Sequence, residues 1–201
     1  MDVNNFVTPD AIKLHRYEKW KKRLKNVPNI LAFLRIILAF LMYLFLVNRN
    51  IFEGIHDSWL DYFAALIFVI ASITDFFDGY IARNFEAVSK LGEILDPLAD
   101  KMLILGAFLG LLFLHRADPW AVYLILVREF FITGLRVVMA SEGLSVKASF
   151  IGKIKTVLQM IAIGWLLMNW PFANVLLWIA VFATLYSGID YIIAYIKASN
   201  D

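Results

Sequence analysis

Six long apolar stretches, separated by short polar segments, dominate the pattern of the chain. Each is close to the length of about 20 residues that an α-helix needs to cross the hydrocarbon core of a bilayer. We therefore predict six membrane-spanning helices, at about residues 29–47, 59–83, 93–114, 119–140, 149–168 and 171–196. The fourth begins at Pro119, a residue suited to the first turn of a helix. The pattern predicts an all-α fold, a polytopic bundle of six transmembrane helices.

The segment before the first span has a different pattern. Between positions 13 and 25 it contains seven lysines and arginines, and apolar residues recur among them at helical spacing. The aromatic residues Tyr17 and Trp20 are of the kind found at membrane interfaces. We predict that residues 1–28 form an amphipathic helix on an anionic membrane surface and that residues 29–201 form one transmembrane domain. The alternative is a solvated basic tail that only sets topology.

The composition supports a membrane protein, because 61% of the residues are hydrophobic and 18% are charged. Ordinary soluble domains have about 45–50% apolar and about 25% charged residues. Cysteine is absent, which excludes a disulfide framework, a thiolate metal site and a cysteine nucleophile.

The basic residues predict the orientation of the spans. One set of ends and loops contains the N-terminal positive charges and six later ones: Arg83, Lys90, Lys147, Lys153, Lys155 and Lys197. The opposite set contains Arg49 and Arg116. Because cytoplasmic loops are enriched in lysine and arginine, we predict that both termini are cytoplasmic. Arg35, early in the first span, belongs to the same cytoplasmic half.

Four aspartates, Asp75, Asp78, Asp96 and Asp100, fall within a window of 26 residues at the predicted cytoplasmic ends of the second and third spans. The spacings of three and four residues place each pair on a common helix face. Four facing carboxylates repel one another unless cations neutralise them. Oxygen ligands suit Mg²⁺ or Mn²⁺, and two such ions serve phosphoryl chemistry. The alternative, ion pairs with Arg83 and Lys101, leaves four acids with two basic partners.

A second group of charges is basic and lies on the fourth and fifth spans: Arg128, Arg136, Lys153 and Lys155. Basic residues in the same cytoplasmic half as a divalent-metal site indicate an anionic second substrate, most simply a phosphate. The alternative is positive-inside topology, which does not explain Arg128 near the middle of a span. Glu129 is a candidate neutralising partner for Arg128. Gly106 and Gly110 form a GxxxG pattern, typical of helix packing within the chain or at a dimer interface.

The aspartate window resembles the signature of the CDP-alcohol phosphatidyltransferases. Every motif position is filled, in the order Asp75, Asp78, Gly79, Ala82, Arg83, Gly92, Asp96 and Asp100. The resemblance implies a six-helix membrane bundle, a homodimer, and transfer of a phosphatidyl group from a CDP-linked lipid to an alcohol with release of CMP. It further implies that the four aspartates hold two divalent ions and that Asp100 is also the general base. The CDP-lipid would be bound by Asn29, Gly79, Ala82, Arg83 and Gly92.

Three further segments, residues 26–30, 127–136 and 152–159, resemble the members of this family whose acceptor is glycerol 3-phosphate. The basic group would then bind the acceptor phosphate through Arg128, Arg136, Lys153 and Lys155. The alternative is a member that makes cardiolipin or uses another acceptor, although cardiolipin synthases typically have Arg-Asp where this chain has Arg128-Glu129. Ala32 departs from the threonine that similar synthases often have in the first helix.

The resemblance implies CDP-diacylglycerol, sn-glycerol 3-phosphate and the lipid bilayer as partners, with no nucleic acid, and a place in the inner or plasma membrane of a bacterium. A cation transporter is an alternative from another class, because intramembrane acids also bind ions. That alternative predicts inverted repeats or broken helices, and the sequence contains no sign of either. A structural scaffold would not need four clustered acids.

Overall fold

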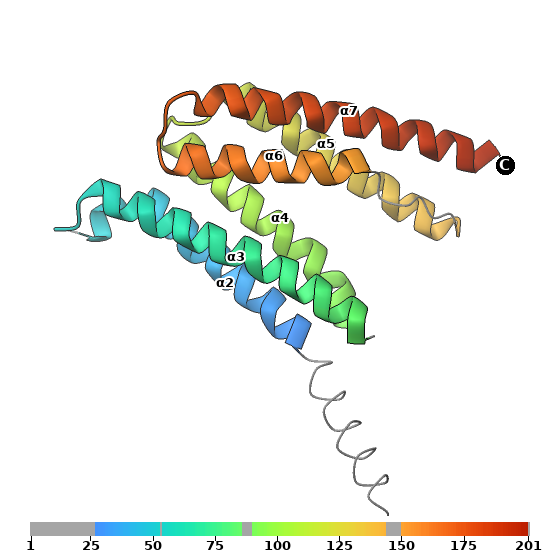
Figure 1. The fold of residues 1–201 in the computed structure, drawn as a ribbon, viewed down its shortest axis with the longest axis horizontal. Coiled ribbons are helices and arrows are strands. Elements are labelled where there is room, and N and C mark those ends of the chain that lie inside the picture. Colours follow the sequence, from blue (N-terminus) through green and yellow to red (C-terminus); the bar gives the residue numbers. More distant parts are fainter. Residues whose placement is uncertain (1–26, 53, 86–89, 144–149, 201) are drawn as a thin grey trace, which may run out of the picture. The chain divides into compact units, whose positions relative to one another are not determined.

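The computed structural model describes residues 27–52, 54–85, 90–143 and 150–200, and within these ranges the fold is all-α (Figure 1). The elements are α2 (Val27–Val47), the short 3-10 helix η1 (Arg49–Phe52), α3 (Asp57–Phe85), α4 (Lys90–Phe113), α5 (Pro119–Ser141), α6 (Phe150–Leu167) and α7 (Ala173–Asn200). The six α-helices coincide with the six predicted stretches. The predicted surface helix lies, up to residue 26, outside the described residues.

Among the described residues, four helical segments are long and apolar enough to cross a membrane: Asn29–Val47, Asp57–Thr74, Phe150–Leu167 and Ala173–Lys197. They correspond to the first, second, fifth and sixth predicted spans. The helices α4 and α5 occupy the positions of the third and fourth, but α5 contains Arg128, Glu129 and Arg136, and α4 contains several charges in its first half. The all-α prediction is confirmed for the described residues, and the count of six spans stays a prediction.

The chain divides into two compact units. One comprises Met1–Phe40 and Val69–Ile104, and the other comprises Leu41–Phe68 and Leu105–Asp201. The helices α2, α3 and α4 contribute residues to both units, whereas α5, α6 and α7 belong entirely to the second. The predicted metal-binding aspartates are therefore in the first unit, and the predicted basic group is in the second.

The core of the second unit is formed by stripes of buried side chains on its three last helices. On α7 the buried positions recur every three or four residues: Ala173, Leu177, Ala180, Val181, Thr184, Ser187 and Tyr191. This spacing gives one continuous face of a helix, and α7 uses it to pack against α5 and α6 (Figure 1). Large apolar side chains such as Phe130 and Phe182 remain exposed, as expected of surfaces that contact lipid.

A buried ion cluster joins the start of α3 to two turns of the second unit. We call it the Asp61 cluster: Arg49, Asp61 and Arg116, with Asp57 beside them. Arg116 donates to Asp61 at 2.8 Å, and Arg49 donates to the other oxygen of the same carboxylate. The Asp61 side chain is only 12% exposed. Two residues that the positive-inside rule assigned to one side of the membrane thus converge on one acid.

Backbone contacts extend this cluster to the helix ends nearby. Arg116 also donates to the carbonyl of Leu167, at the end of α6. Asn174, in the first turn of α7, accepts from the Asp118 amide and donates to the Arg116 carbonyl, both at 3.0 Å. Asp118 in turn caps α5 by accepting from the Ala121 amide. The predicted helix start at Pro119 is confirmed, since Pro119 directly follows this N-cap.

Gly110 lets α4 approach α2 closely. A Cβ atom at this position would lie 2.5 Å from Cδ1 and 2.9 Å from Cβ of Leu46. The second contact is to an atom fixed to the backbone, so rotation of the Leu46 side chain does not remove it. Of the two possible roles of the GxxxG pattern, packing within the chain therefore applies at Gly110.

Replacing Gly110 by alanine is expected to destabilise the fold by about 1–3 kcal/mol, the usual cost of overpacking a core. Gly134, in the middle of α5, is the matched control, because a Cβ there would meet nothing within 4 Å. There the same change should be neutral or stabilising by up to about 1 kcal/mol. Thermal unfolding in detergent measures both. Equal melting temperatures for the two variants would contradict the close contact.

Candidate active site

The four predicted metal-binding aspartates lie on two helices of the first unit. Asp75 and Asp78 are in the C-terminal part of α3, and Asp96 and Asp100 are in the first half of α4. Each pair lies within one helix, as predicted, so residues three or four positions apart share a face of that helix. Of these four side chains only that of Asp100 is among those described, so the joint metal site stays a prediction.

Asp100 forms an ion pair with Arg35 of α2. Arg35 Nη1 donates to Asp100 Oδ1 at 2.5 Å. The Arg35 side chain is completely buried, whereas the Asp100 side chain is 47% exposed. The sequence placed Arg35 in the same half of the membrane as the aspartates but assigned it no role. In the structure Arg35 lies between Ala32 and Ala39 on one buried stripe of α2. A charged residue within this apolar helix was the feature that could have indicated a role for Arg35.

The donor chemistry of this region fits hard divalent cations. The predicted ligands are carboxylates, the class of ligand that Mg²⁺ and Mn²⁺ prefer. Asp100 is half-exposed and its carboxylate is oriented by a guanidinium, which is the kind of outer contact that orients metal-binding carboxylates.

The residues predicted to bind the CDP-lipid lie along the same two helices and at the start of α2. Gly79, Ala82 and Arg83 belong to α3 and Gly92 to α4, but their side-chain surroundings lie outside the described part of the chain. Asn29 is partly buried in the first turns of α2. Ala32, the departure from threonine, is fully buried one turn later.

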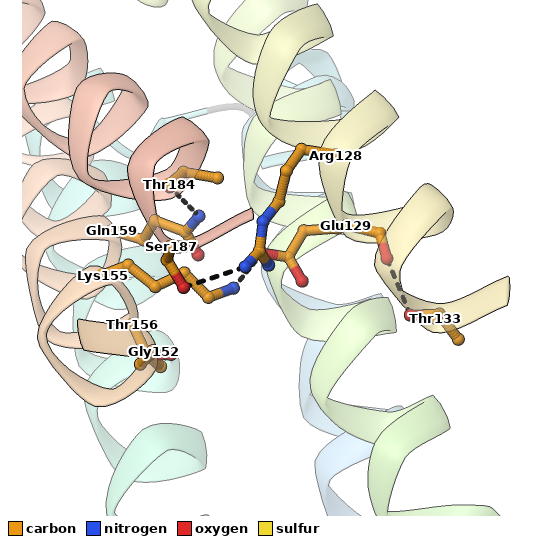
Figure 2. Close-up of polar contacts among 9 residues, drawn as sticks. All are labelled: Arg128, Glu129, Thr133, Gly152, Lys155, Thr156, Gln159, Thr184 and Ser187. Atoms are coloured by element: carbon orange, nitrogen blue, oxygen red, sulfur yellow. Dashed lines mark hydrogen bonds and ion pairs between the residues drawn. The ribbon is translucent and has the colours of Figure 1, made fainter. Parts of the chain in front are cut away.

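Two members of the basic group, Arg128 and Lys155, pair with Glu129 (Figure 2). Arg128 donates to Glu129 at 3.1 Å, and Lys155 of α6 donates to the same oxygen. Arg128 also donates to Ser187 of α7 at 3.0 Å. The prediction that Glu129 neutralises Arg128 is confirmed, and Lys155 is a second partner that the sequence did not indicate.

The surroundings of Arg128 are closely packed. Its side chain is 10% exposed, and a Cβ at Gly188 of α7 would lie 3.2 Å from its Cγ and Nε. One helical turn from Ser187, Thr184 accepts a 2.8 Å hydrogen bond from Gln159 of α6 (Figure 2). A polar layer thus links α5, α6 and α7, and it supplies hydrogen-bond partners to the buried guanidinium of Arg128.

The other two members of the basic group have different surroundings. Arg136 and Lys153 are both exposed. The Arg136 guanidinium lies 5.2 Å from the centre of the Tyr191 ring, a cation–π distance. Within the described ranges, neither forms an ion pair with a carboxylate. The predicted group of four therefore consists of two cations that share the single negative charge of Glu129 and two that are exposed.

Comparison with known proteins assigns the chain to a family. The profile of the CDP-alcohol phosphatidyltransferase family matches residues 25–186. The chain belongs to this family.

The curated relatives of this transferase have consistent names. A "CDP-diacylglycerol--glycerol-3-phosphate 3-phosphatidyltransferase" of Bacillus subtilis is 46% identical over 63% of this chain and 70% of its own length. A protein of the same name from Rickettsia typhi is 38% identical over 84% of this chain and 96% of its own. A "Probable phosphatidylglycerophosphate synthase" of Mycobacterium tuberculosis is 37% identical over 86% and 82%.

The family match encloses every residue that the sequence analysis assigned to the site, from Asn29 to Lys155. The transferase therefore has its aspartate window and its basic group inside the region shared with the family. The structure adds two residues to those predicted ones: Arg35, through Asp100, and Ser187, through Arg128.

Proposed function

We propose that this chain transfers the phosphatidyl group of CDP-diacylglycerol to sn-glycerol 3-phosphate and releases CMP. It would then be a CDP-diacylglycerol–glycerol-3-phosphate 3-phosphatidyltransferase, or phosphatidylglycerophosphate synthase, of phospholipid biosynthesis. The observation that carries the proposal is likeness to proteins of that name over most of their length, 96% of the Rickettsia typhi protein and 70% of the Bacillus subtilis protein. Family membership favours a transferase over a cation transporter, and the names of the relatives favour glycerol 3-phosphate over the acceptor used in cardiolipin synthesis.

The proposed reaction is a displacement at phosphorus. The primary hydroxyl oxygen of glycerol 3-phosphate forms a bond to the phosphorus of the phosphatidyl group. The bond between that phosphorus and the bridging oxygen of the diphosphate breaks, and CMP departs with this oxygen and the electron pair. The hydroxyl proton passes to the carboxylate of Asp100, which acts as general base.

The diphosphate end of CDP-diacylglycerol is assigned to the first unit. Asp75, Asp78, Asp96 and Asp100 would hold two divalent ions, Mg²⁺ or Mn²⁺, with Asp100 serving both as ligand and as base. When bound, such ions neutralise the diphosphate and make the phosphorus more electrophilic. The cytidine end of the lipid is assigned to Asn29, Gly79, Ala82, Arg83 and Gly92.

The phosphate of the acceptor is assigned to the basic group of the second unit. Arg136 and Lys153 support this assignment because both are exposed. Arg128 and Lys155 share Glu129, so an approaching phosphate competes with a carboxylate for them. We therefore propose that Arg136 and Lys153 bind the phosphate directly. Arg128 on α5 and Lys155 on α6 would contribute positive charge without being its principal ligands.

The membrane setting completes the proposal. We propose that α4 and α5 span the bilayer together with the four apolar segments, which gives six spans. Residues 1–28 would lie on the membrane surface, and both termini and the active site would face the cytoplasm of a bacterium. A homodimer is proposed as the assembly, on the resemblance to the family.

An Arg136→Ala variant is expected to raise the KM for glycerol 3-phosphate by about tenfold or more, the usual cost of a lost hydrogen bond to a charged group. The KM for CDP-diacylglycerol should change much less, because Arg136 is assigned to the acceptor alone. Steady-state CMP release, with each substrate varied in turn, measures both constants. Lys197→Ala is the control, since Lys197 is a basic and exposed residue outside the assigned site. An unchanged acceptor KM in the Arg136 variant would remove this residue from the phosphate site.

The acceptor is tested with purified protein, Mg²⁺ or Mn²⁺, CDP-diacylglycerol and a panel of alcohols. Glycerol 3-phosphate should release CMP, whereas inositol phosphate, serine and phosphatidylglycerol should not. CMP release with one of these and none with glycerol 3-phosphate would retain the reaction class but overturn the acceptor.

A further inference from the structure

Arg35 occupies a costly position in α2. It lies on the buried stripe of a helix that is otherwise almost entirely apolar, and its side chain has no exposed surface. A charged side chain within a membrane helix costs several kcal/mol unless a partner compensates it. Residues kept at such a cost usually have a specific partner, and among the described side chains Asp100 on α4 is such a partner of Arg35.

The pair is asymmetric. The guanidinium is completely buried, whereas nearly half of the Asp100 side chain remains exposed. Arg35 therefore contacts the carboxylate from the interior of the first unit, through the hydrogen bond to Oδ1. The exposed part of the carboxylate stays accessible to other groups while its position is fixed from behind.

The Asp61 cluster provides the contrast within the same chain. There one carboxylate accepts from two arginines, one at each oxygen, and it is almost inaccessible. This is the arrangement expected of an ion cluster that only stabilises a fold. The Arg35 pair leaves its carboxylate half-exposed, which a purely structural pair does not require.

We infer that Arg35 is a positioning residue for the transfer reaction, which holds the Asp100 carboxylate in the orientation needed to take the acceptor proton and to bind metal. This inference rests on the proposed function, since it presumes that Asp100 is base and ligand. Arg35 itself touches no reacting atom. Its guanidinium presents donors in a rigid planar array. The orientation of the Asp100 carboxylate therefore depends on the planar geometry of the guanidinium as well as on its charge.

The decisive variants are Arg35→Lys and Arg35→Met. Lysine keeps the buried charge but loses the planar geometry, and methionine removes both. We expect Arg35→Met to lower kcat by about 100-fold, as for a misplaced catalytic group, with the KM for CDP-diacylglycerol little changed. Arg35→Lys should recover part of this loss. Arg49→Met is the matched control, because it also removes a buried arginine from a carboxylate, and its kcat should stay near that of the unchanged protein.

Two further readouts separate positioning from mere stability. Binding of Mn²⁺, followed by electron paramagnetic resonance without substrates, should weaken by about 10–100-fold in Arg35→Met, as when an outer partner of a ligand is removed. In an Asp100→Asn background, Arg35→Met should lower kcat no further, because residues that act together are not additive.

The outcomes distinguish this inference from the proposed function. If the protein without any substitution releases no CMP with glycerol 3-phosphate, the proposed function is overturned. An active protein in which Arg35→Lys and Arg35→Met have normal kcat and normal Mn²⁺ binding overturns the positioning role alone. Additive losses of kcat in the double variant would also overturn the positioning role. So would a loss of activity in Arg35→Lys that equals the loss of folded protein, because Arg35 would then only stabilise the fold.

Discussion

An Asp100→Asn variant is expected to lose turnover by about 10²–10⁴-fold, the range that a general base contributes. An asparagine amide does not take up a proton from the acceptor hydroxyl, and it is a weaker metal ligand than a carboxylate. Its carbonyl oxygen can still accept from Arg35 at the place where Oδ1 now does. The contact between α2 and α4 is therefore retained, and the loss should be chemical.

CMP release measures the turnover of this variant, and equilibrium binding of CDP-diacylglycerol measures the substrate complex separately. Binding should survive in part, because three of the four predicted metal ligands remain. Asp57→Asn is the control, since Asp57 is an exposed acid near the start of α3. Normal turnover in Asp100→Asn would remove Asp100 as base. Equal losses of binding and turnover would make it a binding residue only.

Asp61→Ala should have the largest effect on stability, a loss of about 3–5 kcal/mol, as when one partner of a buried ion cluster is removed. The variant leaves Arg49 and Arg116 buried without the carboxylate that both now contact. These arginines also connect η1, the turn before α5 and the end of α6. The change should therefore loosen several helix ends of the second unit together.

Thermal unfolding in detergent checks this prediction. Asp57→Ala is the matched control, because Asp57 lies 3.5 Å from the same Arg49 but is 68% exposed, and exposed pairs contribute about 0–1 kcal/mol. The two variants should differ clearly in melting temperature. If Asp61→Ala unfolds at the same temperature as Asp57→Ala, the cluster does not stabilise the fold.

The helices could be predicted from the sequence because apolar runs of sufficient length leave few alternatives. The first predicted span, residues 29–47, differs from α2 by two residues at one end, and the fourth starts at the observed N-terminus of α5. Local chemistry determines such features, since Asp118 and Pro119 are a cap and a first helical residue wherever the helix lies.

Pairing between helices was harder to predict. The contacts of Arg35 with Asp100 and of Lys155 with Glu129 join residues 65 and 26 positions apart. Their formation depends on how each helix is rotated about its axis, which an apolar run determines poorly. Glu129 and Arg128 are adjacent, and this pair was predicted correctly. The sequence signal for Arg35 was its charge within the otherwise almost entirely apolar α2, and the structure then showed that positions 32, 35 and 39 form the buried face.

The basic group shows how structure refines a charge pattern. In the sequence Arg136, Lys153 and Lys155 were alike, as cations in one predicted half of the membrane, and Arg128 differed only by its predicted position near the middle of a span. In the structure Glu129 divides them, because Arg128 and Lys155 are its partners while Arg136 lies over Tyr191. Arg136 thus became the most informative residue for testing the acceptor phosphate.

The central claim is transfer of a phosphatidyl group to the hydroxyl of glycerol 3-phosphate, and oxygen labelling tests it most directly. Purified protein would be incubated with a divalent ion, CDP-diacylglycerol and glycerol 3-phosphate carrying ¹⁸O in its primary hydroxyl, and the lipid product and CMP would be analysed by mass spectrometry. The account predicts phosphatidylglycerophosphate that retains the label and CMP that contains none. Unlabelled phosphatidic acid as the lipid product, or label in CMP, would contradict it.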